Sequence, residues 1–148
     1  MERRTLSGSD LTVSALSMGT VNFGSKISEK QAFAHMDRYA ELGGNLLDTA
    51  HVYSDWIPGE RSRSERIIGR WLKSRRPADM VICTKGGHFC LDTPQISRVT
   101  PEERGHDLEK NLDCLKIDRI DLYMFHRDDA ALPVYKTMDL DCSQDGGQ

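Results

Sequence analysis

The stretch GGNLLDTAHVY, residues 43–53, decides how the rest of the chain is read. A glycine pair is typical of the left-handed stop after a helix. Residues Asn45 to Ala50 are interpreted as a strand that follows this helix. This strand carries Asp48 near its end, and Tyr53 follows five residues later. The stretch therefore predicts a helix that ends, a strand that enters the core, and an acid beside a phenol, which suits proton transfer at the rim of a sheet.

Two later apolar runs end on polar residues in the same manner. Residues 80–84 (MVICT) are followed by Lys85, and residues 120–125 (IDLYMF) are followed by His126. Because the carboxyl ends of parallel strands meet at one edge of a sheet, we expect Asp48, Tyr53, Lys85 and His126 to gather there.

Three helices are predicted between these strands. Ser28 with Gln31, and Thr100 with Pro101 and Glu103, have the pattern of helix starts. The middle helix is expected from about Ser64 to Arg75. Apolar side chains at helical spacing indicate the buried faces: Ala32, Phe33, Met36, Tyr39 and Ala40 on the first, Ile67, Ile68, Trp71 and Leu72 on the second, and Leu108, Leu112 and Leu115 on the third.

Alternation of strands and helices predicts an α/β fold with a parallel sheet. A short hairpin is expected over residues 5–14, and a buried strand over 15–18 that ends at Gly19-Thr20. Two architectures fit, an open doubly wound sheet or part of a (β/α)₈ barrel. Polar groups at the ends of several strands favour the barrel. The open dinucleotide fold is disfavoured because residues 19–24 (GTVNFG) lack the middle glycine of its fingerprint.

Composition excludes some classes of function. A net charge of -3 and a pI near 5.9 argue against binding of nucleic acid or acidic membranes. No apolar run has the length of a membrane span, and no signal peptide is recognised, so a cytoplasmic address is expected. The cysteines lack zinc spacing, and a metal site built from His51, His88 and His126 is the less favoured alternative, so no metal is predicted. Arg63, Arg66, Arg70 and Lys73 are interpreted as a solvated helix face rather than a phosphate or nucleic-acid patch.

Taken together, the motifs resemble the aldo-keto reductases from about Arg4 to Val134. The segments that carry the resemblance are Gly19-Thr20, residues 47–53 (LDTAHVY), 64–69 (SERIIG), 83–85 (CTK) and 120–129 (IDLYMFHRDD).

This resemblance implies a reductase of aldehydes or ketones that uses NADPH on a (β/α)₈ barrel and acts on a small carbonyl substrate. The family's catalytic tetrad would fall on Asp48, Tyr53, Lys85 and His126. Tyr53 would donate the proton, Lys85 would ease ionisation of the phenol, Asp48 would hold Lys85, and His126 would orient the substrate carbonyl. Gly19, Thr20 and Asp48 would lie near the nicotinamide ribose, and Trp56 would line the substrate pocket.

The number of predicted elements corresponds to half a barrel, since a closed one needs about 250 residues. Residues 1–134 are expected to form a partial barrel of about four strand-helix units, and residues 135–148 a disordered or non-native tail. We expect a truncated product whose open sheet edges favour self-association. Two functions compete: a reductase, and a catalytically inactive fragment or a non-enzymatic chain that binds a partner.

Overall fold

The structure is a computed structural model that describes residues 1–130, so the tail predicted for 135–148 lies outside the described residues. Its elements, in chain order, are β1 (Arg3–Thr5), β2 (Thr12–Ser14), β3 (Met18–Gly19), α1 (Glu29–Glu41), β4 (Leu46–Asp48), α2 (Arg63–Arg75), β5 (Val81–Gly86), α3 (Pro101–Leu115) and β6 (Leu122–Phe125). No helix in this part of the chain is long and apolar enough to cross a membrane.

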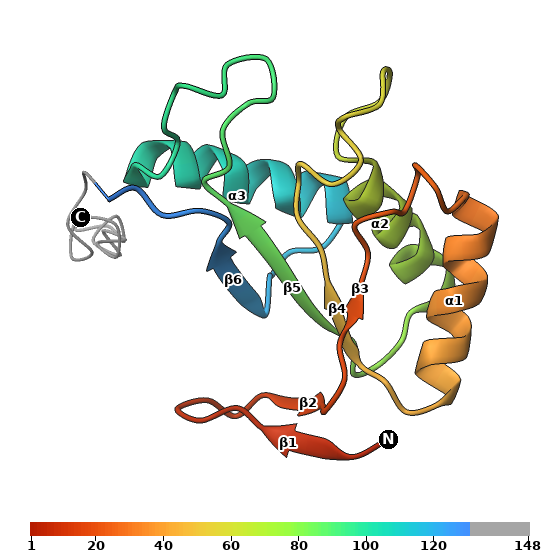
Figure 1. Ribbon diagram of the computed structural model, residues 1–148. Helices are drawn as coiled ribbons and strands as arrows, with labels where there is room; N and C mark the ends of the chain where they lie inside the picture. The colour runs from red at the N-terminus through yellow and green to blue at the C-terminus, as the bar shows by residue number, and fades with distance from the viewer. Residues whose placement is uncertain (131–148) are drawn as a thin grey trace, which may run out of the picture.

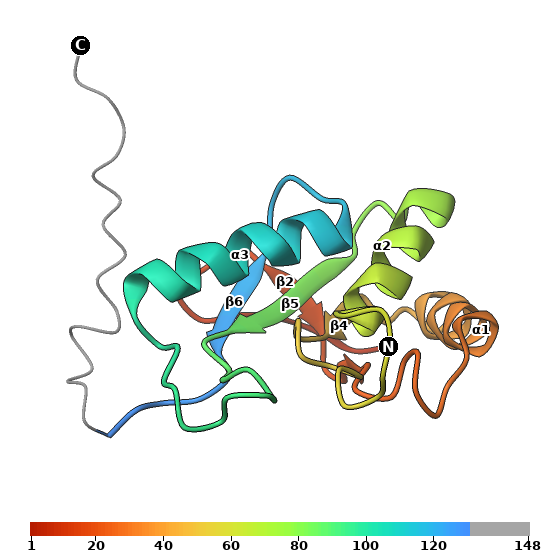
Figure 2. The ribbon, with the colours of Figure 1, turned by 90° about the horizontal axis from the view of Figure 1, so that it is seen from above.

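Four strands form one parallel sheet whose spatial order, β3-β4-β5-β6, is the order of the chain. Each strand pairs with the one before it, as Gly19 does with Asp48 and Lys85 with Met124. In a doubly wound sheet the spatial order of the strands would instead reverse at a switch point. Helices α1, α2 and α3 all cover the same face of the sheet (Figure 1), which the view from above also shows (Figure 2). The arrangement confirms the prediction of successive strand-helix units.

The core fills the space between the sheet and its helices. Leu47 and Ile82 enter it from the sheet, and Ile68 and Trp71 enter it from α2. The Trp71 indole donates a hydrogen bond of 2.7 Å to Asp37 on α1, so the polar edge of this large side chain is satisfied. The main cluster of buried side chains lies on the helix side of the sheet. The site described below lies on the other face, to which Lys85 points.

A short antiparallel hairpin of β1 and β2 lies at the end of the sheet where the strands begin (Figure 1). Asn45, only 1% exposed, fastens it there. Its side-chain oxygen accepts from the Ser14 amide at 2.7 Å, and its nitrogen donates to the carbonyls of Thr12 and Asp79 at 3.0 and 3.1 Å. The loops after β4 and β5 rise from the opposite end, as expected for a catalytic rim.

The buried strand predicted for residues 15–18 is wrong in extent and in burial. Only Met18 of that range belongs to a strand, and Leu16 is 67% exposed. The Leu16 carbonyl accepts a 2.6 Å hydrogen bond from the Tyr39 hydroxyl, so this segment contributes its backbone to the fold. An apolar run of this length does not reveal which way its side chains point.

The leucine stripe predicted for α3 is also only partly correct. Leu115 is fully buried, but Leu108 and Leu112 are half-buried. The buried face is largely polar and consists of Arg104, Asp107, Asn111 and Cys114 beside Leu115. This helix packs against the end of β5, where backbone groups leave the sheet ladder and need side-chain partners.

Candidate active site

Three of the four predicted catalytic residues meet at the carboxyl end of the sheet. The Lys85 ammonium donates to Asp48 Oδ1 at 2.5 Å, to the Thr49 carbonyl at 2.9 Å and to the Tyr53 hydroxyl oxygen at 3.1 Å. An ammonium has three N–H donors, and all three are used. The position of Nζ is therefore fixed by three acceptors that come from the same strand end and loop.

Local structure explains why these side chains converge. Asp48 is the last residue of β4, whereas Lys85 lies inside β5, which runs two residues beyond the predicted end at Thr84. Tyr53 follows in a turn that is closed by a hydrogen bond of 3.0 Å from the Tyr53 amide to the Ala50 carbonyl. The buried Ser54 hydroxyl then donates to the Phe23 carbonyl at 2.8 Å and anchors the loop.

Lys85 remains a cation in this setting. Burial alone would lower the pKa of Lys85, but its hydrogen bonds to Asp48 and Tyr53, together with the charge of Asp48, outweigh that effect, so the pKa of Lys85 is raised. A charged donor thus faces the phenol oxygen of Tyr53 throughout the neutral range.

His126 comes to the same site from the next strand. Its amide donates to the Gly86 carbonyl at 2.8 Å, and its ring meets that of Tyr53 edge to face, with centroids 5.7 Å apart. Burial, assisted by the positive charges of His88 and Lys85, lowers the pKa of His126 to about 4. The imidazole is therefore neutral at pH 7. Its Nδ1 atom is buried and has no hydrogen-bond partner among residues 1–130.

The remaining predicted residues differ in what they present to a ligand. Gly19 ends β3 next to Asp48, is exposed, and has open space where a Cβ would stand. Thr20 is fully buried, and its hydroxyl donates to the Asp48 carbonyl at 2.9 Å while accepting from Ser64 at 2.8 Å. Its side chain therefore holds β4 against α2, and of the Gly19-Thr20 pair Gly19 is the exposed residue. Trp56 is 51% exposed in the loop after Tyr53.

A nicotinamide cofactor fits this surface in one respect that can be checked. No atom of residues 1–130 lies within 4 Å of the point where a Cβ on Gly19 would stand, and the neighbouring Asp48 side chain is 31% exposed, so the backbone at this strand end is open to a ligand. Across residues 1–130, no group of three or more His, Cys, Asp or Glu side chains has the arrangement of a metal site.

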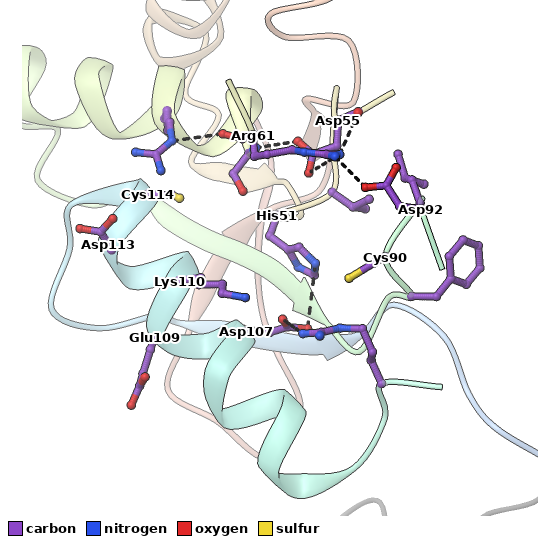
Figure 3. Close-up of a pocket in the computed structure, with 16 residues that line it drawn as sticks. His51, Asp55, Arg61, Cys90, Asp92, Asp107, Glu109, Lys110, Asp113 and Cys114 are labelled. Carbon is purple, nitrogen blue, oxygen red and sulfur yellow. Dashed lines mark hydrogen bonds and ion pairs between the residues drawn. The ribbon is translucent and has the colours of Figure 1, made fainter. Parts of the chain in front are cut away.

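A cavity of about 620 Å³ has His51 and Asp107 in its wall (Figure 3). It is bounded by the loop after β4, the loop after β5 and α3, and none of the four tetrad residues lines it. His51 joins the two regions, since it lines this cavity and its Nδ1 contacts the Lys85 carbonyl at 3.2 Å. Sequence reasoning gave His51 no role beyond a disfavoured metal site, and it did not single out Asp107 or Asn111.

Comparison with known proteins identifies relatives of the chain. The model of the Aldo/keto reductase family matches residues 15–143. The chain is 34% identical over 128 residues to the uncharacterized oxidoreductase YqkF of Bacillus subtilis, which covers 85% of this chain and 39% of that protein. It is 31% identical over 144 residues to a probable voltage-gated potassium channel subunit beta of rice, covering 93% of this chain and 41% of that protein.

A solved structure extends the likeness to three dimensions. The aldo-keto reductase AKR11C1 of Bacillus halodurans, in its holo form, superposes with a TM-score of 0.76 and 32% identity, over 93% of this chain and 44% of that one. The chain thus spans about two fifths of the length of these curated relatives and a little under half of the solved structure.

Proposed function

The chain belongs to the aldo/keto reductase family, and on that premise we propose that it reduces aldehydes or ketones to alcohols with NADPH as the reductant. The four residues that the resemblance assigns to catalysis, Asp48, Tyr53, Lys85 and His126, are proposed to act as one site. Gly19 and Asp48 are proposed to contact the cofactor, and Trp56 to cover the substrate.

The observation that supports this proposal best is the direction of the Lys85–Tyr53 hydrogen bond. Lys85 has only donors, so the Tyr53 oxygen accepts, at 3.1 Å. The hydroxyl hydrogen of Tyr53 is therefore not used on Lys85. This hydrogen is available to a ligand on the open face. When Tyr53 gives up its proton, the Lys85 ammonium already donates a hydrogen bond to the phenol oxygen that becomes negatively charged.

The chemistry follows from these positions. NADPH, when bound near Gly19 and Asp48, would supply a hydride for the carbonyl carbon, so the residues of this chain would have to meet negative charge on the carbonyl oxygen. Tyr53 transfers its proton to that oxygen, and the N–H of Lys85 stabilises the charge left on the phenol. Asp48, at 2.5 Å, keeps the Lys85 ammonium in place. Neutral His126 hydrogen-bonds the substrate oxygen and orients it toward Tyr53.

Replacement of Tyr53 by Phe tests the proposal. It removes the proton donor and leaves the ring, so NADPH-dependent reduction of a panel of aldehydes and ketones should fall by a factor on the order of 10²–10⁴. NADPH affinity, followed by nucleotide fluorescence, should stay close to that of the unaltered chain. Tyr123→Phe is the matched control, because its hydroxyl points to the Arg104 carbonyl on the helix side and its loss should leave turnover unchanged. Equal activity of Tyr53→Phe and the unaltered chain would refute the assignment of the acid.

A second candidate is binding of another copy of the chain along the open sheet edges. Among the described residues β3 and β6 each have one neighbour, and Met124 on β6 is 51% exposed on the face that holds Lys85. A two-fold axis along the strands would place β6 parallel to β3 of the second copy and make eight strands. The described fold matches 44% of the solved relative, so two copies match its size.

A further inference from the structure

The backbone at the end of β5 is held by side chains that lie behind the proposed active site. The Lys85 carbonyl accepts from His51 Nδ1 at 3.2 Å and from the Asn111 side-chain nitrogen at 3.3 Å. A carbonyl oxygen only accepts, so the proton of His51 is on Nδ1. Nε2 of the same ring then faces Asp107 at 4.0 Å.

Asp107 is the centre of this arrangement. The carboxylate is fully buried, and its Oδ2 accepts from the Gly87 amide at 2.9 Å. Its Oδ1 accepts from the Arg98 guanidinium at 2.5 Å, which supplies the positive charge that a buried carboxylate needs. Gly87 has a left-handed φ of +77°, and this turn directs its amide back toward α3.

Asp107 and Asn111 are spaced by one helical turn and therefore share one face of α3. Together they contact the backbone on both sides of Gly86, whose carbonyl accepts from the amide of His126 at 2.8 Å. The same short segment thus carries Lys85 and supports His126. A shift of this segment would move both residues relative to Tyr53.

We propose that Asp107, with His51, is a positioning residue that fixes the end of β5 and so sets the places of the Lys85 ammonium and the His126 ring. Both residues line the cavity of about 620 Å³, which none of the four tetrad residues lines. Both act through the backbone of Lys85 and Gly87. The proposal rests on the reductase function proposed above, and it adds residues that the family resemblance did not assign.

The kinetic test replaces Asp107 by Asn, which keeps the shape and weakens the bonds to Gly87 and Arg98. A displacement of about 1 Å at the reacting groups lowers rates on the order of a hundredfold, so kcat should fall by that factor while the KM for the carbonyl changes little. Asp113→Asn is the control, because Asp113 lies on the same helix but is exposed and pairs with Lys116 at 2.6 Å. It should leave kcat unchanged. An unchanged kcat in Asp107→Asn would overturn the proposal.

A second measurement does not depend on turnover. In ¹⁵N-labelled protein, the Lys85 side-chain and His126 ring resonances should move in Asp107→Asn and stay in place in Asp113→Asn. If the unaltered chain reduces no carbonyl, the proposed function fails, and these resonances alone decide whether Asp107 positions the site.

His51→Ala provides the same test if Asp107→Asn does not fold. His51 lies in a loop with its side chain 15% exposed, and its loss removes one of the two side-chain donors to the Lys85 carbonyl. His51→Gln, which can restore a donor, should recover part of the lost kcat and return the Lys85 resonance toward its original position. Unchanged Lys85 and His126 resonances in His51→Ala would overturn the proposal.

Discussion

Glu65 is a buried carboxyl whose protonation is set by its surroundings. It is fully buried, and one oxygen accepts from the Thr84 hydroxyl at 2.5 Å. Its Oε2 atom is buried and has no hydrogen-bond partner within residues 1–130, and the same holds for Oδ1 of Asn111, whose side-chain nitrogen donates to Thr84 at 3.3 Å. Burial raises the pKa of Glu65 to about 8, although the Thr84 hydrogen bond acts in the opposite direction. At pH 7 the side chain is therefore predominantly neutral, and it links α2 to β5 without a charge.

Glu65→Gln should change how stability depends on pH. Between about pH 4.5 and 8 the unfolded carboxyl has lost its proton while the folded one retains it, so the folded state binds more protons and stability falls as pH rises. The slope has a limit of about 1.4 kcal/mol per pH unit. The Gln variant lacks this loss, and urea denaturation from pH 5 to 8 should show its stability gaining on that of the unaltered chain.

His126 changes the pH dependence of stability in the opposite direction to Glu65, and it is present in both the unaltered chain and the Glu65→Gln variant. Its lowered pKa makes stability rise with pH between about 4 and 6.5, because there the unfolded ring binds the proton that the folded ring does not. When the free energy of unfolding of the unaltered chain is subtracted from that of Glu65→Gln at each pH, the contribution of His126 cancels. Glu102→Gln, at an exposed position in the first turn of α3, serves as the control and should parallel the unaltered chain. Parallel curves for Glu65→Gln would show that Glu65 is ionised in the fold.

The contact between α2 and α3 depends on the absence of a side chain at Gly69. A Cβ there would stand 2.6 Å from the Cys114 carbonyl oxygen and 2.7 Å from that of Leu115. Gly69→Ala must push the helices apart and should lower the free energy of unfolding by about 1–3 kcal/mol. Chemical denaturation measures this directly.

Gly105→Ala is the matched control on α3. A Cβ at Gly105 meets no atom of residues 1–130 within 4 Å, so Ala should raise the free energy of unfolding by about 0.5–1 kcal/mol through its better helix propensity. If the two substitutions changed stability in the same direction, the close approach of α2 and α3 would not be a constraint on the fold.

The starts of α1 and α3 could be predicted from the sequence because helix capping depends on residues close together in the chain. Strand order could be predicted because short connections through a helix favour pairing of successive strands. Ser28 and Gln31 form the predicted capping box, and Thr100 accepts from the Glu103 amide. Gly43 adopts the predicted left-handed φ, at +82°. The alternation of elements likewise predicted successive parallel strands.

Other features depend on contacts between segments far apart in the chain. Thr20 was assigned to the cofactor surface, yet its hydroxyl faces Asp48 and Ser64 inside the fold. The polar face of α3 could have been found from the helical spacing of Arg104, Asp107 and Asn111, but polar residues at that spacing normally indicate a solvated face. Only the position of α3 over the end of β5 shows that these side chains are buried.

At the scale of the whole molecule, the two outer strands β3 and β6, each with one neighbour in the part of the chain that the structure describes, predict self-association. The sedimentation-average mass of the chain should rise from monomer toward dimer as concentration increases. Met124→Lys places a charge on the edge strand β6, where unpaired charges oppose pairing, and should hold the chain as a monomer. Leu42→Lys, at a position with the same 51% exposure beside α1, should not change the association. If the unaltered chain sedimented with the mass of a monomer at all concentrations, a second copy of the chain would be excluded as its partner.

The agreement between strand order and chain order also bears on how the protein is made. Every strand from β4 to β6 pairs with the strand synthesised just before it. Each can therefore join the sheet as it leaves the ribosome, without waiting for a distant segment. The hydrogen bonds between Lys85, Asp48 and Tyr53 lie within residues 48–85. The centre of the proposed site can thus form while the rest of the polypeptide is still being translated.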